Sequence, residues 1–189
     1  LARLDNEQPL YLLCDAGALS CPPRYRKWRR LLNDVKGLPK ADQLKRLNAG
    51  INALIEHRDD TDVFAARDYW AAPMEFLLNG GDCEDYTILK YASLLKLGYS
   101  DRQLRIAVVR DVSRRIDHAV LAVADAQGAI ILDNMSDTPV SHEQIVHYRP
   151  VYSVNRHSRW VHIATRQISR LHAAQTEKAG RAGPVSSTN

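Results

Sequence analysis

The order of two periodicities constrains the fold of this chain more than any other feature of its sequence. Apolar residues recur at helical spacing over 24–36, over the segment after Pro39, and over 83–97. The pattern then changes to short β-branched runs at 104–110, 118–124 and 129–133, with further candidate strands at 150–155 and 159–165. Helices followed by an antiparallel meander are typical of α+β proteins, so the sequence predicts that fold class.

The length of 189 residues predicts one main domain. We expect an irregular lead-in over 1–23, the folded domain over 24–171, and a disordered tail over 172–189, where the sequence becomes small and polar and ends in AGRAGPVSSTN. No apolar run approaches the length needed to span a bilayer. The sequence therefore predicts no insertion into a membrane.

The net charge of +4 comes in large part from the segment RYRKWRR at 24–30. Tyr25, Trp28, Leu32 and Val35 recur there at helical spacing, and the basic residues lie mostly off that stripe. This pattern favours the solvated face of an amphipathic helix over a nucleic-acid footprint, so no nucleic-acid partner is predicted. A basic docking face for an acidic protein stays open as an alternative.

The chain has three cysteines, Cys14, Cys21 and Cys83. The first two are close enough in sequence to be bridged, which would suit an oxidising compartment such as the periplasm; two free thiols in a reducing cytosol are the alternative. Residues 1–10 show no basic start followed by an apolar stretch, so no signal peptide is visible. Since the chain does not begin with Met, a leader removed earlier is compatible with the sequence.

The segment GGDCEDYTILKY at 80–91 places a cysteine at the predicted start of a helix. Asp82 is a natural N-cap, and Asp85 follows three residues later in a near capping-box arrangement. Unpaired N–H groups and the helix dipole favour an anion at this position, which lowers the pKa of a thiol. Cys83 is therefore a candidate nucleophile, although a small buried side chain is the commoner role of a helical cysteine.

A base for this thiol is suggested by the next two strands. His118 begins one strand, and Asp133 ends the strand that follows it across the turn DAQG. If the two strands pair as a hairpin, both side chains lie at the same end of the sheet, as a base and its orienting carboxylate must. The other histidines lack such a partner, so we expect them to be structural or surface residues.

Together, the blocks YWAAPMEFLLNGGDCEDYTILKY, DHAVLAV and ILDN resemble the bacterial transglutaminase-like cysteine proteinase family, over roughly residues 25–164. The resemblance implies a papain-like or transglutaminase-like fold with the nucleophile at a helix N-terminus, followed by an antiparallel sheet. The catalytic cysteine, histidine and aspartate of the family correspond to Cys83, His118 and Asp133. We expect the Cys83 N–H to contribute to the oxyanion hole, with Trp70 or Asn79 as candidates for a second donor.

The resemblance also implies a setting. Members of this family cleave a large cell-surface adhesin near its N-terminus in the periplasm, require calcium, and are inhibited by an inner-membrane cyclic-di-GMP receptor, which together control biofilm attachment. The calcium-binding acids of the family correspond to Asp82, Glu84 and Asp85, and calcium prefers such oxygen ligands. Amide transfer by the same triad, or a binding module that has lost the chemistry, are the alternatives.

Overall fold

The computed structural model describes residues 1, 3–17 and 20–162, and the predicted tail over 172–189 lies outside them. Within the described residues, helices come first and strands after them, as predicted for an α+β protein. The helices are α1 (Arg3–Asn6), α2 (Gln8–Asp15), α3 (Pro23–Val35), α4 (Lys40–Leu54), α5 (Asp60–Val63), α6 (Pro73–Asn79) and α7 (Cys83–Lys96). The strands are β1 (Leu104–Asp111), β2 (Ile116–Asp125), β3 (Gly128–Asp133), β4 (Ser136–Ser141), β5 (Tyr148–Val154) and β6 (Arg159–Val161).

The strands form one antiparallel sheet in the order β4-β3-β2-β1-β5-β6. The first four strands form the predicted meander, and the sequence pattern missed β4, whose segment SDTPVS carries little apolar character. The meander does not continue beyond β4, however. The chain returns through a short 3-10 helix (His142–Gln144), and β5 then pairs with β1 rather than with β4.

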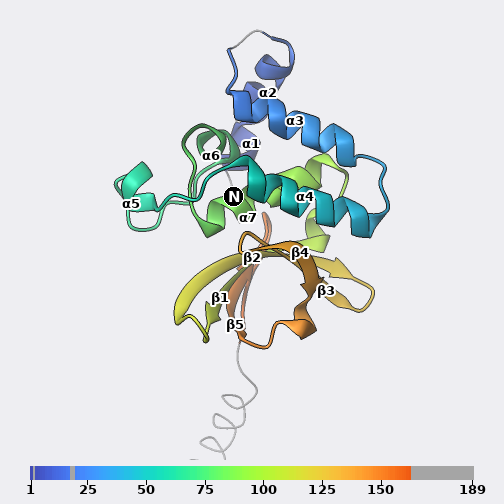
Figure 1. The fold of residues 1–189 in the computed structure, drawn as a ribbon, viewed down its shortest axis with the longest axis vertical. Coiled ribbons are helices and arrows are strands. Elements are labelled where there is room, and N and C mark those ends of the chain that lie inside the picture. Colours follow the sequence, from blue (N-terminus) through green and yellow to red (C-terminus); the bar gives the residue numbers. More distant parts are fainter. Residues whose placement is uncertain (2, 18–19, 163–189) are drawn as a thin grey trace, which may run out of the picture.

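The helices lie together on one side of the sheet (Figure 1). Helix α7 packs directly against β2, β1 and β3, while α4 covers β4 and α3 packs on α4. Every side chain of α7 from Glu84 to Leu94 is buried. The helix that begins at Cys83 is therefore the centre of the molecule and is held on several sides.

Helix α3 has the amphipathic pattern expected from its sequence. Tyr25, Trp28, Leu32 and Val35 are its buried residues, and the basic residues between them are exposed or half-buried. The indole N–H of Trp28 donates to Ser93 Oγ on α7 at 2.8 Å. This hydrogen bond satisfies the only polar atom of a fully buried indole and links the outer helix layer to the central helix.

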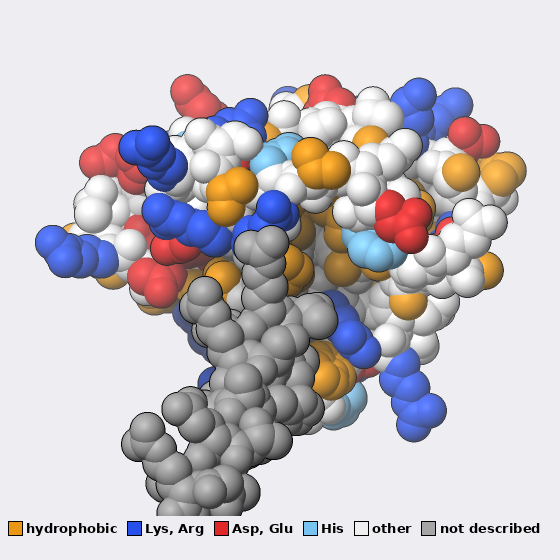
Figure 2. All heavy atoms as spheres, turned by 90° about the horizontal axis from the view of Figure 1, so that it is seen from below, with side chains coloured by type: hydrophobic (Ala, Val, Ile, Leu, Met, Phe, Trp, Pro, Cys, Tyr) orange, Lys and Arg blue, Asp and Glu red, His pale blue; other side chains and the backbone are white. Residues whose placement is uncertain are grey.

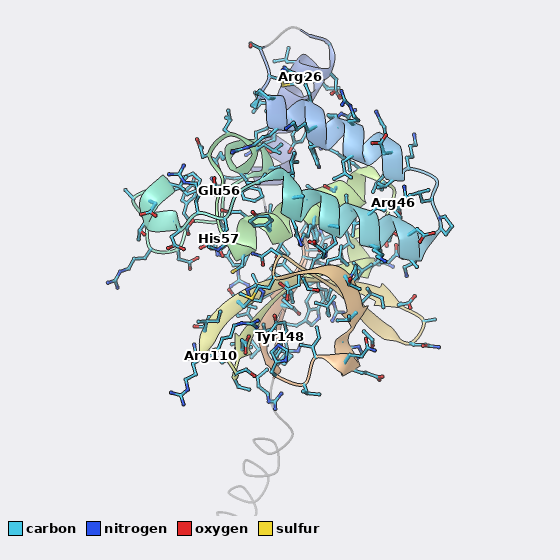
Figure 3. The ribbon with its side chains drawn as sticks, viewed as in Figure 1. Arg26, Arg46, Glu56, His57, Arg110 and Tyr148 are labelled. Carbon is cyan, nitrogen blue, oxygen red and sulfur yellow. A yellow bond between two sulfur atoms is a disulfide. The ribbon has the colours of Figure 1, made fainter. Side chains whose placement is uncertain are left out.

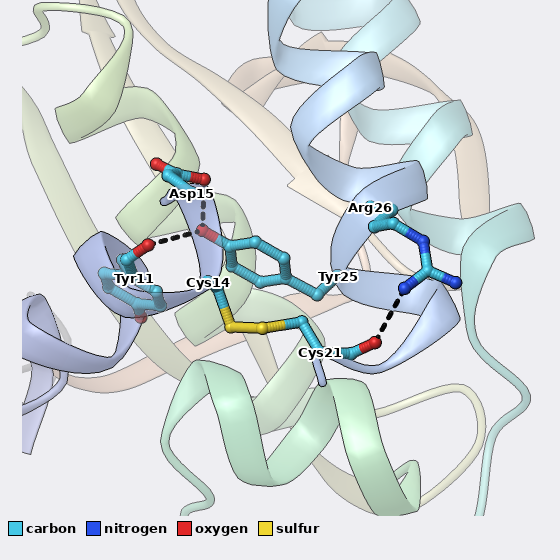
Figure 4. Close-up of a disulfide and its surroundings, with 6 residues drawn as sticks. All are labelled: Tyr11, Cys14, Asp15, Cys21, Tyr25 and Arg26. Carbon is cyan, nitrogen blue, oxygen red and sulfur yellow. Dashed lines mark hydrogen bonds between the residues drawn. A yellow bond between two sulfur atoms is a disulfide. The ribbon is translucent and has the colours of Figure 1, made fainter. Parts of the chain in front are cut away.

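The prediction of an irregular lead-in over 1–23 is wrong for most of its described residues. Helices α1 and α2 form there, and a disulfide between Cys14 and Cys21 joins the end of α2 to the start of α3 (Figure 4). The Tyr25 hydroxyl lies 2.8 Å from Asp15 Oδ1, and Arg26 donates to the Cys21 carbonyl at 2.9 Å. The disulfide and these contacts fix a segment too short to build a core of its own.

The face of the sheet turned away from the helices is hollowed. Figure 2 shows this face from below, with hydrophobic side chains at the floor of the hollow. A small apolar cluster of Val109, Val120 and Ile131 lies there, with Tyr148 packed against it. No helix in the described part of the chain is long and apolar enough to cross a membrane.

Lys90 on α7 is unusual because its side chain is 0% exposed, and its Nζ has no hydrogen-bond partner among the described residues. Burial lowers the pKa of Lys90 to about 7, although the nearby charges of Asp133 and Asp137 oppose that shift. The amine of an unfolded chain keeps its proton up to about pH 10.5. The buried charge therefore costs stability below about pH 7, and this cost disappears as the pH rises toward 10.5.

We predict that Lys90→Met raises the free energy of unfolding, on the order of 1–3 kcal/mol near pH 6, and by much less near pH 10 (about the unperturbed amine pKa). Urea unfolding at the two pH values measures both quantities. Lys45→Met is the control, because Lys45 is exposed on α4 and should show no such dependence on pH. An equal effect of Lys90→Met at both pH values would contradict the prediction.

Candidate active site

Cys83 is the first residue of α7, and a glycine pair brings the chain into this helix. Gly80 has a φ of +81°, a conformation that favours glycine. A side chain at Gly81 would collide with the carboxylate of Asp85. Asp85 uses that space to accept the backbone N–H of Asp82 at 3.3 Å and that of Ala71 at 2.6 Å. The two glycines thus allow Asp85 to fold back over the helix start.

Cys83 and His118 line the same cavity, which has a volume of about 570 Å³. The cavity lies between the end of α4, the start of α7, the start of β2 and the turn that follows β3. Its other lining residues are Asn52, Ile55, His57, Asp59, Asp82, Tyr86, Ile116, Asp117, Asn134 and Met135. His57 lies at the rim on an exposed loop (Figure 3). The predicted nucleophile and base therefore face a common space that is large enough for a peptide segment.

The surroundings of the Cys83 thiol favour its protonated form. Its Sγ donates to Glu84 Oε2 at 3.3 Å. Burial raises the pKa of the Cys83 thiol well above its usual range, and the negative charges of Glu84 and Asp82 raise it further. The backbone N–H of Ala119, next to His118, acts in the opposite direction. A thiol in this environment needs a change in the surrounding charge before it can become a nucleophile.

His118 and Asp133 form a buried pair at one end of the sheet. Strands β2 and β3 pair in antiparallel register, with Leu121 opposite Leu132, and this register brings the start of one strand beside the end of the other. His118 Nε2 lies 2.9 Å from Asp133 Oδ1, and the two residues are 2% and 8% exposed. His118 Nδ1 is buried and has no hydrogen-bond partner among the described residues.

The ionised form of Asp133 is stabilised by its hydrogen bonds. Burial alone would raise the pKa of this carboxyl, but hydrogen bonds from His118, Met135 and Tyr148 lower it overall. The Met135 backbone N–H donates at 2.8 Å and the Tyr148 hydroxyl at 2.7 Å. An anionic Asp133 fixes the proton of His118 on Nε2, and Nδ1 is then free to accept a proton from another group.

A cluster of carboxylates lies close to the start of α7. One oxygen each from Asp60, Asp82 and Asp85 lie within 4.8 Å of one another, and so do one oxygen each from Asp60, Asp68 and Glu84. Oδ1 of Asp60 and Oδ1 of Asp82 are buried without a hydrogen-bond donor among the described residues. A divalent cation with a preference for oxygen ligands fits this set, because it would supply both the missing partners and the missing charge.

The pKa values of these acids reflect their crowding. Burial raises the pKa of Glu84 to about 9, and its hydrogen bond and repulsion with Asp82 add to the shift. Burial also raises the pKa of Asp85 to about 8, with further repulsion from Asp82 and Asp60. Without a cation the cluster therefore resists full ionisation at neutral pH.

The structure brings the predicted residues together in two groups. His118 is in contact with Asp133 and lines the same cavity as Cys83. Asp82, Glu84 and Asp85 all lie at the start of the same helix. The sequence analysis missed Asp60 and Asp68, because nothing in the spacing links either acid to Cys83. It also missed Tyr148. The proximity of Asp60 and Asp68 to the start of α7, and that of Tyr148 to Asp133, depends on the fold of the chain.

Trp70 and Asn79 are the candidates for a second donor of an oxyanion hole. Neither Trp70 nor Asn79 lines the cavity that contains Cys83. The Trp70 indole N–H donates instead to Asp68 at 2.8 Å, and Asn79 is exposed with its carbonyl accepting from Arg58. The Trp70 side chain and the Asn79 carbonyl therefore have other contacts in this structure, and the role of either residue as a second donor stays a prediction.

Comparison with known proteins gives a consistent result. The family model described as bacterial transglutaminase-like cysteine proteinase BTLCP matches residues 10–168. Calcium-bound LapG of Legionella pneumophila is 26% identical, with a TM-score of 0.69 over 93% of this chain and 98% of LapG. EGTA-treated LapG is 28% identical, with a TM-score of 0.67 over 82% of this chain and 87% of LapG. No curated protein matches the chain.

The raised pKa values of Glu84 and Asp85 predict a dependence of stability on pH. Both acids hold their protons longer in the folded than in the unfolded chain, so the stability linked to them is present below about pH 4 and is lost as the pH rises through about 8 to 9. In a chelator, we expect the thermal midpoint to fall between about pH 5 and pH 9. Glu84→Gln should reduce this fall, whereas Glu56→Gln, at an exposed position, should not. An equal slope in all three proteins would contradict this prediction.

Proposed function

This chain belongs to the bacterial transglutaminase-like cysteine proteinase family, and from that premise we propose that it is a calcium-dependent endopeptidase of the periplasm that uses Cys83, His118 and Asp133. The observation that carries the proposal is the buried His118–Asp133 pair: His118 lines the same cavity as the free cysteine Cys83, and its Nδ1 has no hydrogen-bond partner among the described residues. The amphipathic helices, central nucleophile helix and antiparallel sheet support a transglutaminase-like version of the papain fold.

In the proposed reaction, the Cys83 thiol transfers its proton to His118 Nδ1, and the thiolate attacks the carbonyl carbon of the scissile amide. His118 then donates this proton to the leaving amine, which gives an acyl-enzyme. A water molecule loses a proton to the same nitrogen and attacks the thioester carbonyl. The C–S bond then breaks, the carboxylic acid product leaves, and His118 returns the proton to Cys83. Throughout the cycle Asp133 keeps the Nε2 proton in place and stabilises the imidazolium form.

The thiol has to turn before this cycle can begin, because Cys83 Sγ donates to Glu84 in the structure. We propose that rotation about the Cα–Cβ bond of Cys83 breaks the contact with Glu84 and turns the sulfur toward His118. The unpaired backbone N–H groups at the start of α7 favour the thiolate formed there. The Cys83 N–H is also the proposed donor to the oxyanion of the tetrahedral intermediate.

The acidic cluster is the proposed calcium site. Asp60, Asp82, Glu84 and Asp85 would supply oxygen ligands, with Asp68 at the rim, and the number of acids suits a cation that takes six to eight oxygens. When bound, calcium supplies positive charge that offsets the repulsion among these carboxylates. Glu84 would then no longer act as the acceptor for the Cys83 proton. The calcium-bound form of a similar protein, LapG, supports the choice of metal.

The proposed location and substrate follow from the family. The Cys14–Cys21 disulfide suits an oxidising compartment, which supports the periplasm. We propose that the substrate is a large cell-surface adhesin cut near its N-terminus, which would release cells from a biofilm. An inner-membrane cyclic-di-GMP receptor is the proposed inhibitor. The similarity to LapG supports this assignment.

We predict that Cys83→Ala lowers proteolysis by at least about a thousandfold, because it removes the sulfur that is proposed to form the acyl-enzyme. Secretion of a large surface protein fragment into the medium, measured by mass spectrometry on cells producing either protein, gives the readout. The melting temperature should stay close to that of the parent protein, because Cys83 lies at the helix start and its side chain is not fully buried. Equal release of the fragment by Cys83→Ala would reject Cys83 as the nucleophile.

The metal site gives a second prediction, with a readout independent of activity. Calcium should raise the melting temperature of protein that a chelator has freed of metal. The increase should be larger near pH 8 than near pH 5, because about pH 5 is close to the ordinary carboxyl pKa values and the raised carboxyl groups are then still protonated. Asp60→Asn should reduce this stabilisation, because it removes one charge from the cluster. Asp62→Asn is the matched control on the same short helix, where the side chain is exposed. Equal calcium stabilisation in both variants would exclude Asp60 from the site.

A further inference from the structure

The carboxylate of Asp133 has a different set of partners on each of its oxygens. Oδ1 accepts from His118 Nε2 at 2.9 Å and from the Met135 backbone N–H at 2.8 Å. Oδ2 accepts from the Tyr148 hydroxyl at 2.7 Å. Rotation of the carboxylate about its own bond would therefore break the Tyr148 contact as well as the one to His118. Tyr148 is the side chain that resists this rotation.

The chain delivers Tyr148 to this position by the crossover that the sequence did not predict. Tyr148 is the first residue of β5 and lies opposite Asp111 of β1. Its ring centroid is 5.7 Å from that of His118 and 4.6 Å from that of the preceding residue, His147. The aromatic ring thus contacts the imidazole while the hydroxyl binds the carboxylate, so a single side chain touches both members of the pair.

From these contacts we infer that Tyr148 is a positioning residue of the proposed catalytic pair, which holds the Asp133 carboxylate in the orientation that keeps His118 Nδ1 available to the Cys83 thiol. A hydrogen bond from a hydroxyl to a carboxylate is charge-assisted and stronger than a neutral one. Half-burial of Tyr148 reduces the competition from water for this bond. The inference rests on the proposed function, because a positioning residue has a role only if Cys83 and His118 react.

The titration of Asp133 is consistent with this role. Tyr148 is among the donors that hold the pKa of Asp133 below its usual value. Burial raises the pKa of Tyr148 far above its usual range, and the hydrogen bond to Asp133 and its negative charge raise it further. Tyr148 therefore stays a neutral donor over the working pH range. The other charged or titratable groups that act on this pair are Lys90 of α7, Asp111 of β1, Arg114 of the turn before β2, and His147 beside Tyr148.

The test is the rate at which iodoacetamide alkylates Cys83 as a function of pH, in calcium-containing buffer. The disulfide removes Cys14 and Cys21 from reaction, so the signal reports Cys83 alone. Tyr148→Phe keeps the ring beside His118 and removes only the hydroxyl. We expect its rate near pH 7 to fall about tenfold, with the pH profile displaced to higher pH, because a less well oriented imidazole stabilises the Cys83 thiolate less.

A merely structural role would lower the melting temperature without moving the pH profile, so thermal denaturation is measured on the same samples. Tyr99→Phe is the matched control, because it removes a hydroxyl that lies beyond the end of α7, away from Asp133. His118→Ala separates the inference from the proposed function. If it alkylates with the profile of the parent protein, both fail; if it differs while Tyr148→Phe matches the parent protein, the inference alone is overturned.

Discussion

The burial of helix α7 on nearly every side is the constraint on which the rest of the structure depends. Its residues from Glu84 to Leu94 are all buried, between α4 and α6 on one side and the sheet on the other. Thr87 Oγ1 lies 3.1 Å from the Ala119 carbonyl, next to His118. Because this helix cannot shift without opening the core, the position of Cys83 relative to β2 is fixed by packing rather than by the loop that precedes it.

The same burial disfavours charged side chains throughout the site. Acids, a thiol and Lys90 all lie in surroundings that disfavour their charged forms, and each has its pKa moved toward the neutral form. Asp133 is the exception: burial would raise its pKa, but hydrogen bonds from His118 and two further donors lower it. The cysteine therefore lies between an acidic side that opposes the thiolate and an imidazole side that favours it. The reactivity of Cys83 depends on whether the acids or the imidazole has the larger effect on its thiolate.

Local sequence patterns predicted the parts of this molecule that depend on neighbours along the chain. The stripe of Tyr25, Trp28, Leu32 and Val35, the helix starting at Cys83, and the hairpin joining His118 to Asp133 follow from spacings of three, four or two residues. Helices α1 and α2 were missed because a proline and a short polar segment hide their periodicity. Asp60 and Tyr148 were missed for a different reason: their contacts depend on the return of chain segments over long distances, which no local pattern encodes.

The path of β5 shows why topology as well as composition determines the candidate site. Had β5 paired with β4 and extended the meander, its first residue would lie beyond the edge strand, separated from Asp133 by β4. Because the chain crosses back and pairs with β1, Tyr148 lies on the hollowed face close to His118. The helix layer then supplies the thiol and the acids, while the sheet supplies the imidazole, its carboxylate and the tyrosine. The site is complete only where the two layers meet, so neither layer would have the chemistry alone.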